Sequence, residues 1–251
     1  MVVLKKIKKN YQKYFTLKVI KKLVAFYNTL DVIYPQELII KQNDKILVLA
    51  PHPDDEVIGC GGLLLKYAKN CDVVCLSDGR YGDENIEPLE MAEIRKKEFE
   101  NVMNEIDVNG FDFLYIEDSK VKYSYNKFKQ IEFKKYDYIF IPNYLDQHPD
   151  HKAVLELLLK AYKENLINKN TKIAMYEIWN ALCLINYYTD ISNITDKKKE
   201  IINKYCSQVK HIDYAKKILA LNEYRGLAVG KKSIEAYFIL NIQDLVKVID
   251  E

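Results

Sequence analysis

Residues 45–56 of the chain read KILVLAPHPDDE. The run at residues 45–50 is short and strongly apolar, and Pro51 ends it, which predicts a buried β-strand. Residues 57–69 follow with apolar side chains at helical spacing and with glycines near the start, which predicts a helix. A buried strand that runs through a polar turn into a helix is typical of the first unit of an α/β sheet.

The same alternation continues along the chain. Further strands are predicted at residues 71–77, 111–116, 138–141, 172–178 and 236–242, and further helices at residues 88–106, 151–166, 197–208 and 212–224. Alternating strands and helices indicate an α/β fold with a Rossmann-like, mostly parallel sheet and helices on both faces. Ligands of such sheets bind beyond the carboxyl ends of the strands, so functional residues are expected just after each strand.

Composition limits the classes of function. The 251 residues fit one large domain or two small ones, and 49% hydrophobic with 29% charged residues predicts a soluble globular chain. Residues 1–30 hold eight lysines and no acid, so the remainder has 30 basic and 36 acidic residues, which gives no reason to expect nucleic-acid binding. The odd count of five cysteines and the absence of a long apolar run predict a reduced cytoplasmic protein without a membrane span.

The basic N-terminal segment is predicted to be a separate helical extension over residues 1–40, before a catalytic domain at residues 41–251. Its apolar residues recur at helical spacing between lysines: Leu4, Ile7, Tyr11, Tyr14 and Phe15. We favour a helix whose apolar face packs on the domain. The alternative is a peripheral helix on an anionic membrane through residues 1–30, which would favour a lipid-linked substrate.

Three of the four histidines follow predicted strands. His52 lies two residues past the first strand, and His148 and His151 lie past the strand at residues 138–141. A catalytic zinc takes three ligands from His, Asp or Glu and keeps a fourth position for water. The two loops contain more histidines and aspartates than three ligands require, so spacing alone leaves the individual roles open.

Both loops resemble known motifs. PHPDDE at residues 51–56 and HPDH at residues 148–151 resemble the two signature motifs of the PIG-L/LmbE-like N-acetylglucosaminyl deacetylases. Further similarity lies in GCGG (residues 59–62), SDG (77–79), Arg95 with Glu98, YCSQ (205–208) and EAYF (235–238). The resemblance covers about residues 44–240 and implies an LmbE-like fold.

The resemblance implies a role for each site residue. It makes His52, Asp55 and His151 the ligands of a zinc ion, for which iron(II) is the alternative. It makes Asp54 the general base and His148 the group that stabilises the oxyanion and protonates the leaving amine, with Asp150 orienting His148. Arg95 and Asp118 would bind hydroxyl groups of the sugar.

The expected reaction is removal of an N-acetyl group from an N-acetylglucosaminyl-type amino sugar, carried as a glycoside or linked to a lipid or a nucleotide. Amide hydrolysis on a non-sugar substrate is one alternative, because zinc-dependent hydrolysis of an amide does not require that the amide nitrogen be attached to a sugar. A metal- or sugar-binding module without turnover is another, although a binder needs neither Asp54 nor His148. The glycines at residues 59–62 lack dinucleotide-binding spacing, so we interpret them as sites of close helix–sheet packing.

Overall fold

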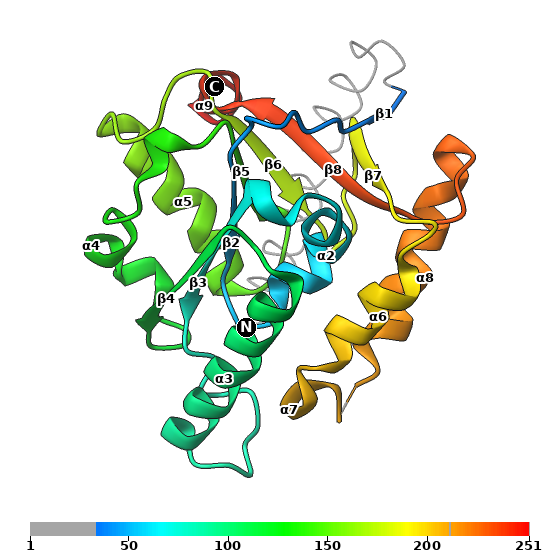
Figure 1. Ribbon diagram of the computed structural model, residues 1–251. Coiled ribbons are helices and arrows are strands. Elements are labelled where there is room, and N and C mark those ends of the chain that lie inside the picture. Colours follow the sequence, from blue (N-terminus) through cyan, green and yellow to red (C-terminus); the bar gives the residue numbers. More distant parts are fainter. Residues whose placement is uncertain (1–33, 211, 251) are drawn as a thin grey trace, which may run out of the picture. The chain divides into compact units, whose positions relative to one another are not determined.

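The computed structural model describes residues 34–210 and 212–250, and residues 35–251 form one compact unit (Figure 1). Most of the predicted N-terminal extension, residues 1–33, lies outside the described residues, and so does His211. None of the described helices is both long enough and apolar enough to cross a membrane.

The unit is built on an eight-stranded sheet with the order β1-β7-β8-β6-β5-β2-β3-β4. Only β8 runs against its neighbours β6 and β7, so the sheet is mostly parallel, as predicted. The strands are β1 (Gln36–Glu37), β2 (Ile46–Ala50), β3 (Cys71–Ser77), β4 (Gly110–Ile116), β5 (Tyr138–Pro142), β6 (Lys172–Tyr176), β7 (Tyr187–Asp190) and β8 (Ile234–Asn241).

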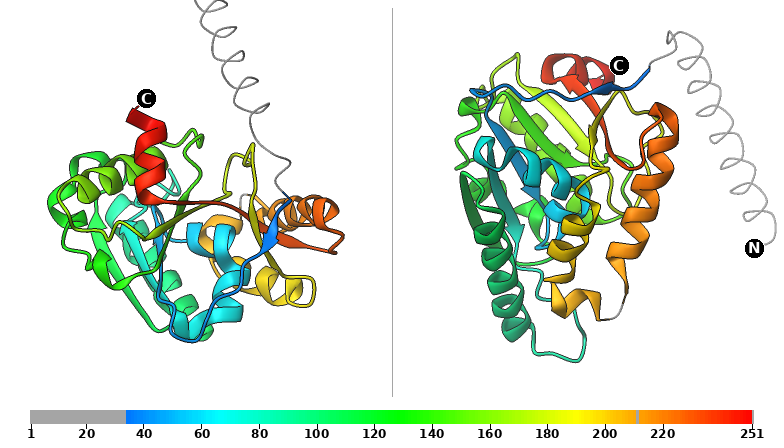
Figure 2. Two further views of the ribbon diagram at one scale, coloured as in Figure 1. Left: turned by 90° about the horizontal axis from the view of Figure 1, so that it is seen from above. Right: turned by 45° about the vertical axis from the view of Figure 1, so that its right-hand side comes forward.

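Helices cover both faces of the sheet, as Figure 2 shows. One face carries α2 (Asp55–Tyr67), α3 (Pro88–Ile106), α6 (Thr195–Asn203) and α8 (Tyr214–Gly226), and the other carries α4 (Tyr125–Phe128), α5 (Pro149–Lys163) and α9 (Ile242–Asp250). Short α7 (Cys206–Val209) follows α6, and 3-10 turns lie at η1 (Ala68–Asn70), η2 (Val121–Tyr123), η3 (Phe133–Lys135) and η4 (Leu227–Val229).

Alternate residues of the central strands supply two hydrophobic cores. Along β2, Ile46 and Val48 face one core, whereas Leu47 and Leu49 face the other. All five residues of β2 are buried, because a strand with helices on both sides has no solvent face. This explains why its sequence is a continuous apolar run.

Helix α2 packs very closely on the sheet at its glycines. A Cβ atom on Gly59 would lie 2.1 Å from the ring of Tyr176 in β6, and one on Gly62 would lie 2.2 Å from Ile191. Any side chain at either position would therefore push the helix off the sheet. The interpretation of these glycines as packing sites is consistent with this contact.

A buried ion pair also joins α2 to the sheet. The carboxylate of Glu235 in β8 accepts the N–H groups of Gly62 and Leu63 at 2.6 and 2.9 Å. The ammonium group of Lys198 lies 2.7 Å from that carboxylate and donates to the carbonyl oxygen of Ile58 at 3.0 Å. Both charged side chains are at most 1% exposed, so removal of either one would leave the other charge buried without its partner, which is strongly destabilising.

The domain boundary and one helix are among the features that differ from expectation. Strand β1 pairs with β7 ahead of residue 41, where the sequence places the start of the domain, and Leu38 and Ile40 are buried in the core. The helix predicted at residues 197–208 is interrupted at Lys204 and Tyr205 and forms α6 and α7. The interruption turns the phenol of Tyr205 inward, where it donates a hydrogen bond to Glu56.

Candidate active site

The predicted histidines meet where the chain order of the sheet reverses. Strands β2 and β5 are parallel neighbours, and the chain continues from β2 toward β3 on one side and from β5 toward β6 on the other. Ligands bind at such switch points. The ring centroid of His52 lies 4.6 Å from that of His148 and 5.4 Å from that of His151.

The loop after β2 is held in an unusual conformation. Asp54 has a φ of 121°, which a residue with a side chain rarely adopts and which costs about 1–3 kcal/mol. Arg95 from α3 donates to the carbonyl oxygens of Pro53 and Gly79 and lies 3.2 Å from the Asp54 carboxylate. Glu56 accepts the N–H group of Asp54 at 3.1 Å. Such locally enforced strain is typical of a catalytic loop.

Asp55 lies between two histidine rings. Its Oδ2 atom is 3.3 Å from Nδ1 of His52 and 3.2 Å from Nε2 of His151. Two ligands of a tetrahedral zinc ion, each about 2.0–2.1 Å from the metal, lie about 3.3 Å apart. Although His151 Nε2 is this close to Asp55, it is buried without hydrogen-bond geometry. This spacing fits a metal held by His52, Asp55 and His151. His52 Nε2 and His151 Nδ1 are likewise buried without a hydrogen bond, and among the described residues the ligand atoms also group as His52 with His148 and His151, and as His52 with Asp118 and Asp150.

The opposite ring nitrogens of both histidines face carboxylates. His52 Nε2 lies 3.3 Å from Asp118 and 3.4 Å from Asp150, and His151 Nδ1 lies 3.1 Å from Asp146. Metal-binding histidines usually direct their second nitrogen to a carboxylate, which fixes the ring and its tautomer. Sequence analysis missed Asp146, because its spacing from His151 does not show that the loop folds back onto that ring.

Asp150 differs from its predicted role. Its carboxylate accepts hydrogen bonds from the N–H groups of Ser119 and Val121 at 2.8 and 3.2 Å. The histidine nitrogen that lies near this carboxylate is Nε2 of His52, at 3.4 Å. The contact with His148 runs through the backbone, because the Asp150 N–H donates to His148 Nδ1 at 3.3 Å. Asp150 lies in the first turn of α5, where its side chain turns back toward the loop after β4.

The close contacts between the histidines and aspartates of this cluster shift their pKa values. Burial works against a charge on His52 and His151, but the surrounding aspartates raise the pKa of His52 well above its usual range and that of His151 to about 9. Burial would also raise the pKa of Asp55, but both histidines hold it well below its usual range. Metal binding at these three residues must therefore displace protons from the rings.

The two groups with predicted catalytic roles are shifted differently. Burial raises the pKa of Asp54 to about 7, and the nearby Arg95 opposes that rise. The pKa of His148 lies below its usual value, first because the ring is partly buried and then because His52 and His151 repel its charge. Asp54 is thus suited to a base near neutral pH, whereas His148 favours its neutral form.

A hollow of about 160 Å³ opens onto this cluster. Every residue predicted to act on substrate except Asp150 lines it, including both predicted sugar-binding residues. Its lining also contains Gln208 of the YCSQ motif and four residues that the sequence did not single out: Tyr81, Gly82, Trp179 and Tyr214. Typical ligand sites are about 300–1,000 Å³, so this hollow holds one sugar ring or less and leaves the rest of a larger substrate outside.

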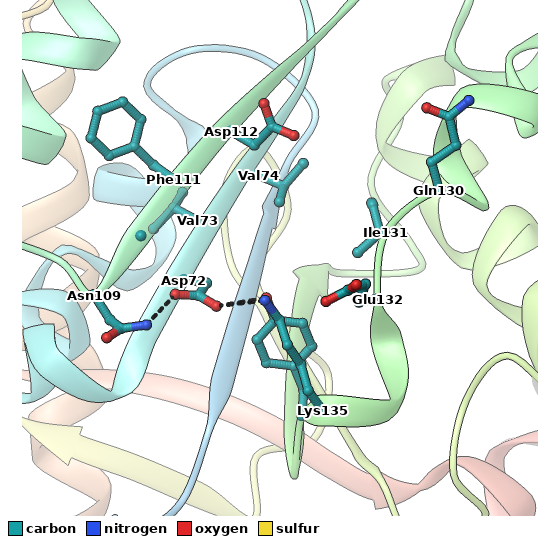
Figure 3. A pocket seen from close by; sticks show the side chains of 12 residues that line it. Asp72, Val73, Val74, Asn109, Phe111, Asp112, Gln130, Ile131, Glu132 and Lys135 are labelled. Carbon is teal, nitrogen blue, oxygen red and sulfur yellow. Dashed lines mark hydrogen bonds and ion pairs between the residues drawn. The ribbon is translucent and has the colours of Figure 1, made fainter.

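A larger hollow of about 420 Å³ lies at the other end of the sheet, beside the amino ends of β3 and β4 (Figure 3). The carboxylate of Asp72 there is already bound by Asn109 at 2.7 Å, Tyr136 at 2.7 Å and Lys135 at 3.3 Å. Its lining residues include neither histidine nor cysteine. We therefore place the chemistry at the smaller hollow.

Known proteins are similar to this chain in sequence and in fold. Residues 47–162 match the family model described as PIG-L: GlcNAc-PI de-N-acetylase. The probable N-acetyl-α-D-glucosaminyl L-malate deacetylase 2 of Bacillus subtilis (strain 168) is 26% identical over 187 residues, which cover 66% of this chain and 84% of that protein.

Solved structures support the fold. The N,N'-diacetylchitobiose deacetylase of Pyrococcus horikoshii superposes with a TM-score of 0.69 at 24% identity, over 89% of this chain and 92% of that one. The 4-carboxy-2-hydroxymuconate hydratase of Pseudomonas putida KT2440 superposes with a TM-score of 0.61 at 18% identity, over 78% of this chain and 96% of that one. A hydratase with this fold shows that the fold alone does not fix the reaction. The matched region contains both histidine motifs, so residues 47–162 are similar to the PIG-L family of de-N-acetylases, as the motifs predicted.

Proposed function

We propose that this protein is a zinc-dependent hydrolase that removes the acetyl group from an N-acetylglucosaminyl-type sugar. The observation that carries the proposal is the position of Asp55 between His52 and His151, next to the strained and buried Asp54. The N,O,N donor set suits zinc, and iron(II) is the alternative occupant.

A zinc ion held there supplies a Lewis acid for the acyl carbonyl group and lowers the pKa of water to about 7. The protein's own contribution begins with Asp54, whose carboxylate takes a proton from the attacking water. Its pKa of about 7 suits a base that must accept a proton and release it again. Arg95 keeps the carboxylate in place through their 3.2 Å contact.

His148 then stabilises the negative oxygen that develops on the acyl carbon. Because its Nδ1 accepts the N–H group of Asp150, the neutral ring carries its proton on Nε2 and can donate it as a hydrogen bond. A neutral ring is consistent with the lowered pKa of His148, to which burial contributes most. The proton accepted by Asp54 passes to the amine nitrogen as the C–N bond breaks, which yields acetate and a free amino sugar.

The hollow supports a sugar substrate through its polar lining. Asp118 and Gln208 offer hydrogen-bonding groups in its lining, and its volume of about 160 Å³ limits it to one sugar ring or less. The N-acetylglucosaminyl compounds named for the relatives share such a ring, whereas their other portions differ.

Acetate release from a panel of N-acetylated compounds tests the proposal. We expect acetate from N-acetylglucosaminyl compounds and none from N-acetylated amino acids, and we expect a metal chelator or Asp54→Asn to abolish the signal. Release from the amino acids alone would support the non-sugar alternative. Metal binding without any acetate release would support a non-catalytic module.

A further inference from the structure

Three aromatic side chains surround the mouth of the active-site hollow. Tyr81 and Trp179 are 56% and 46% exposed, and Tyr214 is partly exposed. We call these three residues the aromatic rim. Tyr81 follows β3 and Trp179 follows β6, so in the sheet order the two lie on opposite sides of the loop that carries His52.

The loop that carries Trp179 is fixed from two directions. The N–H group of Trp179 donates to Asp146 at 3.3 Å, and that carboxylate also faces the metal ligand His151. Farther along the loop, the N–H group of Leu182 donates to Glu177 at 2.6 Å, and Arg225 from α8 binds the same carboxylate. An exposed aromatic ring on so constrained a loop is preorganised for a ligand, because little conformational entropy is lost on binding.

The Trp179 ring also has an aromatic neighbour on one side. Its centroid lies 5.4 Å from that of Tyr214 with an angle of 54° between the planes. This contact fixes the ring orientation at the mouth of the hollow. The hollow has a volume of only about 160 Å³, so the part of a larger substrate that lies outside it would meet the rim.

Charges around the mouth disfavour an anionic group. Among the described residues that line the hollow, Arg95 is the only lysine or arginine, and its guanidinium is bound to Asp54 and to two carbonyl groups. Beside Tyr81, Arg80 lies between two carboxylates, 2.6 Å from Asp78 and 3.6 Å from Glu117. The hydroxyl of Tyr81 donates to Glu117 at 3.4 Å. One arginine and two carboxylates leave these three charged neighbours of Tyr81 with a net charge of −1.

We infer that the aromatic rim is a subsite for a neutral second sugar ring, and that the substrate is a neutral N-acetylglucosaminyl disaccharide or oligosaccharide rather than a conjugate with an anionic aglycone. This inference rests on the deacetylase activity proposed above. An aromatic face binds the C–H surface of a pyranose ring without needing a charge. A malate or phosphate group at the same place would meet Glu117 without a free cation from the described lining residues.

Steady-state kinetics on three substrates tests the inference in the full-length, metal-loaded protein. The probes are N-acetylglucosamine, N,N'-diacetylchitobiose and N-acetylglucosaminyl malate, with acetate as the measured product. We expect kcat/KM for the disaccharide to exceed that for the malate conjugate at least about tenfold. Trp179→Ala should lower kcat/KM for the disaccharide about tenfold, mainly through KM, and Trp179→Phe should retain most of it.

Matched variants separate the rim from general damage. Tyr123→Ala removes an 80% exposed tyrosine in η2, outside the lining of the hollow, and should leave both rates unchanged. Glu117→Gln should raise the rate with the malate conjugate relative to the disaccharide. Faster turnover of the malate conjugate by the wild type, or equal losses in Trp179→Ala and Tyr123→Ala, would overturn the inference and leave the deacetylase standing. Acetate from none of the three substrates would refute both.

Discussion

Replacing Asp54 by asparagine separates its role in catalysis from its effect on stability. The change removes a buried negative charge and keeps the shape of the side chain. Without a base, turnover should fall about 10²–10⁴-fold. Metal content should stay the same, because His52, Asp55 and His151 are untouched.

The same variant should be more stable, and the structure gives the size of the gain. Burial raises the pKa of Asp54 from 3.8 to about 7, a shift of about three units. At about 1.4 kcal/mol per unit, the ionised carboxylate destabilises the fold by about 4 kcal/mol at pH 8. Arg95 loses a charged partner but keeps its two carbonyl groups, so we expect a net gain of about 2 kcal/mol, or about 4–8 °C in Tm.

The pH dependence of this gain has a defined sign. In the unfolded chain the carboxyl group ionises near pH 4, whereas in the folded protein it ionises near pH 7. Its contribution to the free energy of unfolding is therefore lost as the pH rises from about 4 to 7. The variant should gain stability over the wild type across that interval and keep the full gain above it.

Thermal unfolding of chelator-treated protein at pH 5 and pH 8, followed by circular dichroism, measures this effect. Glu93→Gln, at an exposed position of α3, serves as the control and should not shift Tm at either pH. Equal Tm values for wild type and Asp54→Asn at pH 8 would refute the account of burial as the cause of the raised pKa. Near-normal turnover would show that another group is the base.

Three further results are expected. Zinc binding to the metal-free protein at pH 7.5 should release one to two protons, because the pKa values of His52 and His151 are raised. Calorimetry in buffers of different ionisation enthalpy measures the number of protons released. A zinc titration without proton release would contradict the proposed ligands. Asp146→Asn should weaken zinc binding about 10–100-fold in chelator competition, and unchanged affinity would show that the ring of His151 does not need this carboxylate. Deletion of residues 1–30 should leave zinc content and acetate release intact. A lower Tm would then favour packing of the extension on the domain, whereas loss of salt-sensitive co-sedimentation with anionic vesicles, at about 1 kcal/mol per lysine, would favour a membrane helix.

Local patterns predicted the elements that bury their own side chains. The strand Cys71–Ser77 and the helix Pro88–Ile106 match their predicted bounds, since the strand contains an apolar run at residues 73–76 and the helix has proline at its first position. Strand β7 was not predicted, because Tyr187–Asp190 has neither an apolar run nor clear alternation. Strand β1 has only two residues and is defined by its pairing with β7, which no local pattern shows.

The site shows the same limit. The strand ends predicted that His52 and His148 would meet, because the carboxyl ends of parallel neighbours share one edge of the sheet. The sequence could not predict the contacts of Asp146 and Asp150, because these contacts depend on how the loops fold over that edge of the sheet. The rim residue Trp179 was missed for the same reason, as its exposure depends on the conformation of a loop fixed by Glu177 and Asp146.

The ion pair of Lys198 and Glu235 has a consequence for synthesis of the chain. Glu235 follows Gly62 by 173 residues, although it binds the middle of the helix that begins with Asp55. At about 5–20 residues per second, the ribosome needs roughly 10–35 s to cover that distance. Over the last 84 residues of this interval, after His151 is made, a nascent chain has all three proposed metal ligands, and the amide groups of Gly62 and Leu63 still lack their carboxylate. A chain released at residue 230 would thus contain every group proposed to hold the metal and lack the carboxylate that binds helix α2.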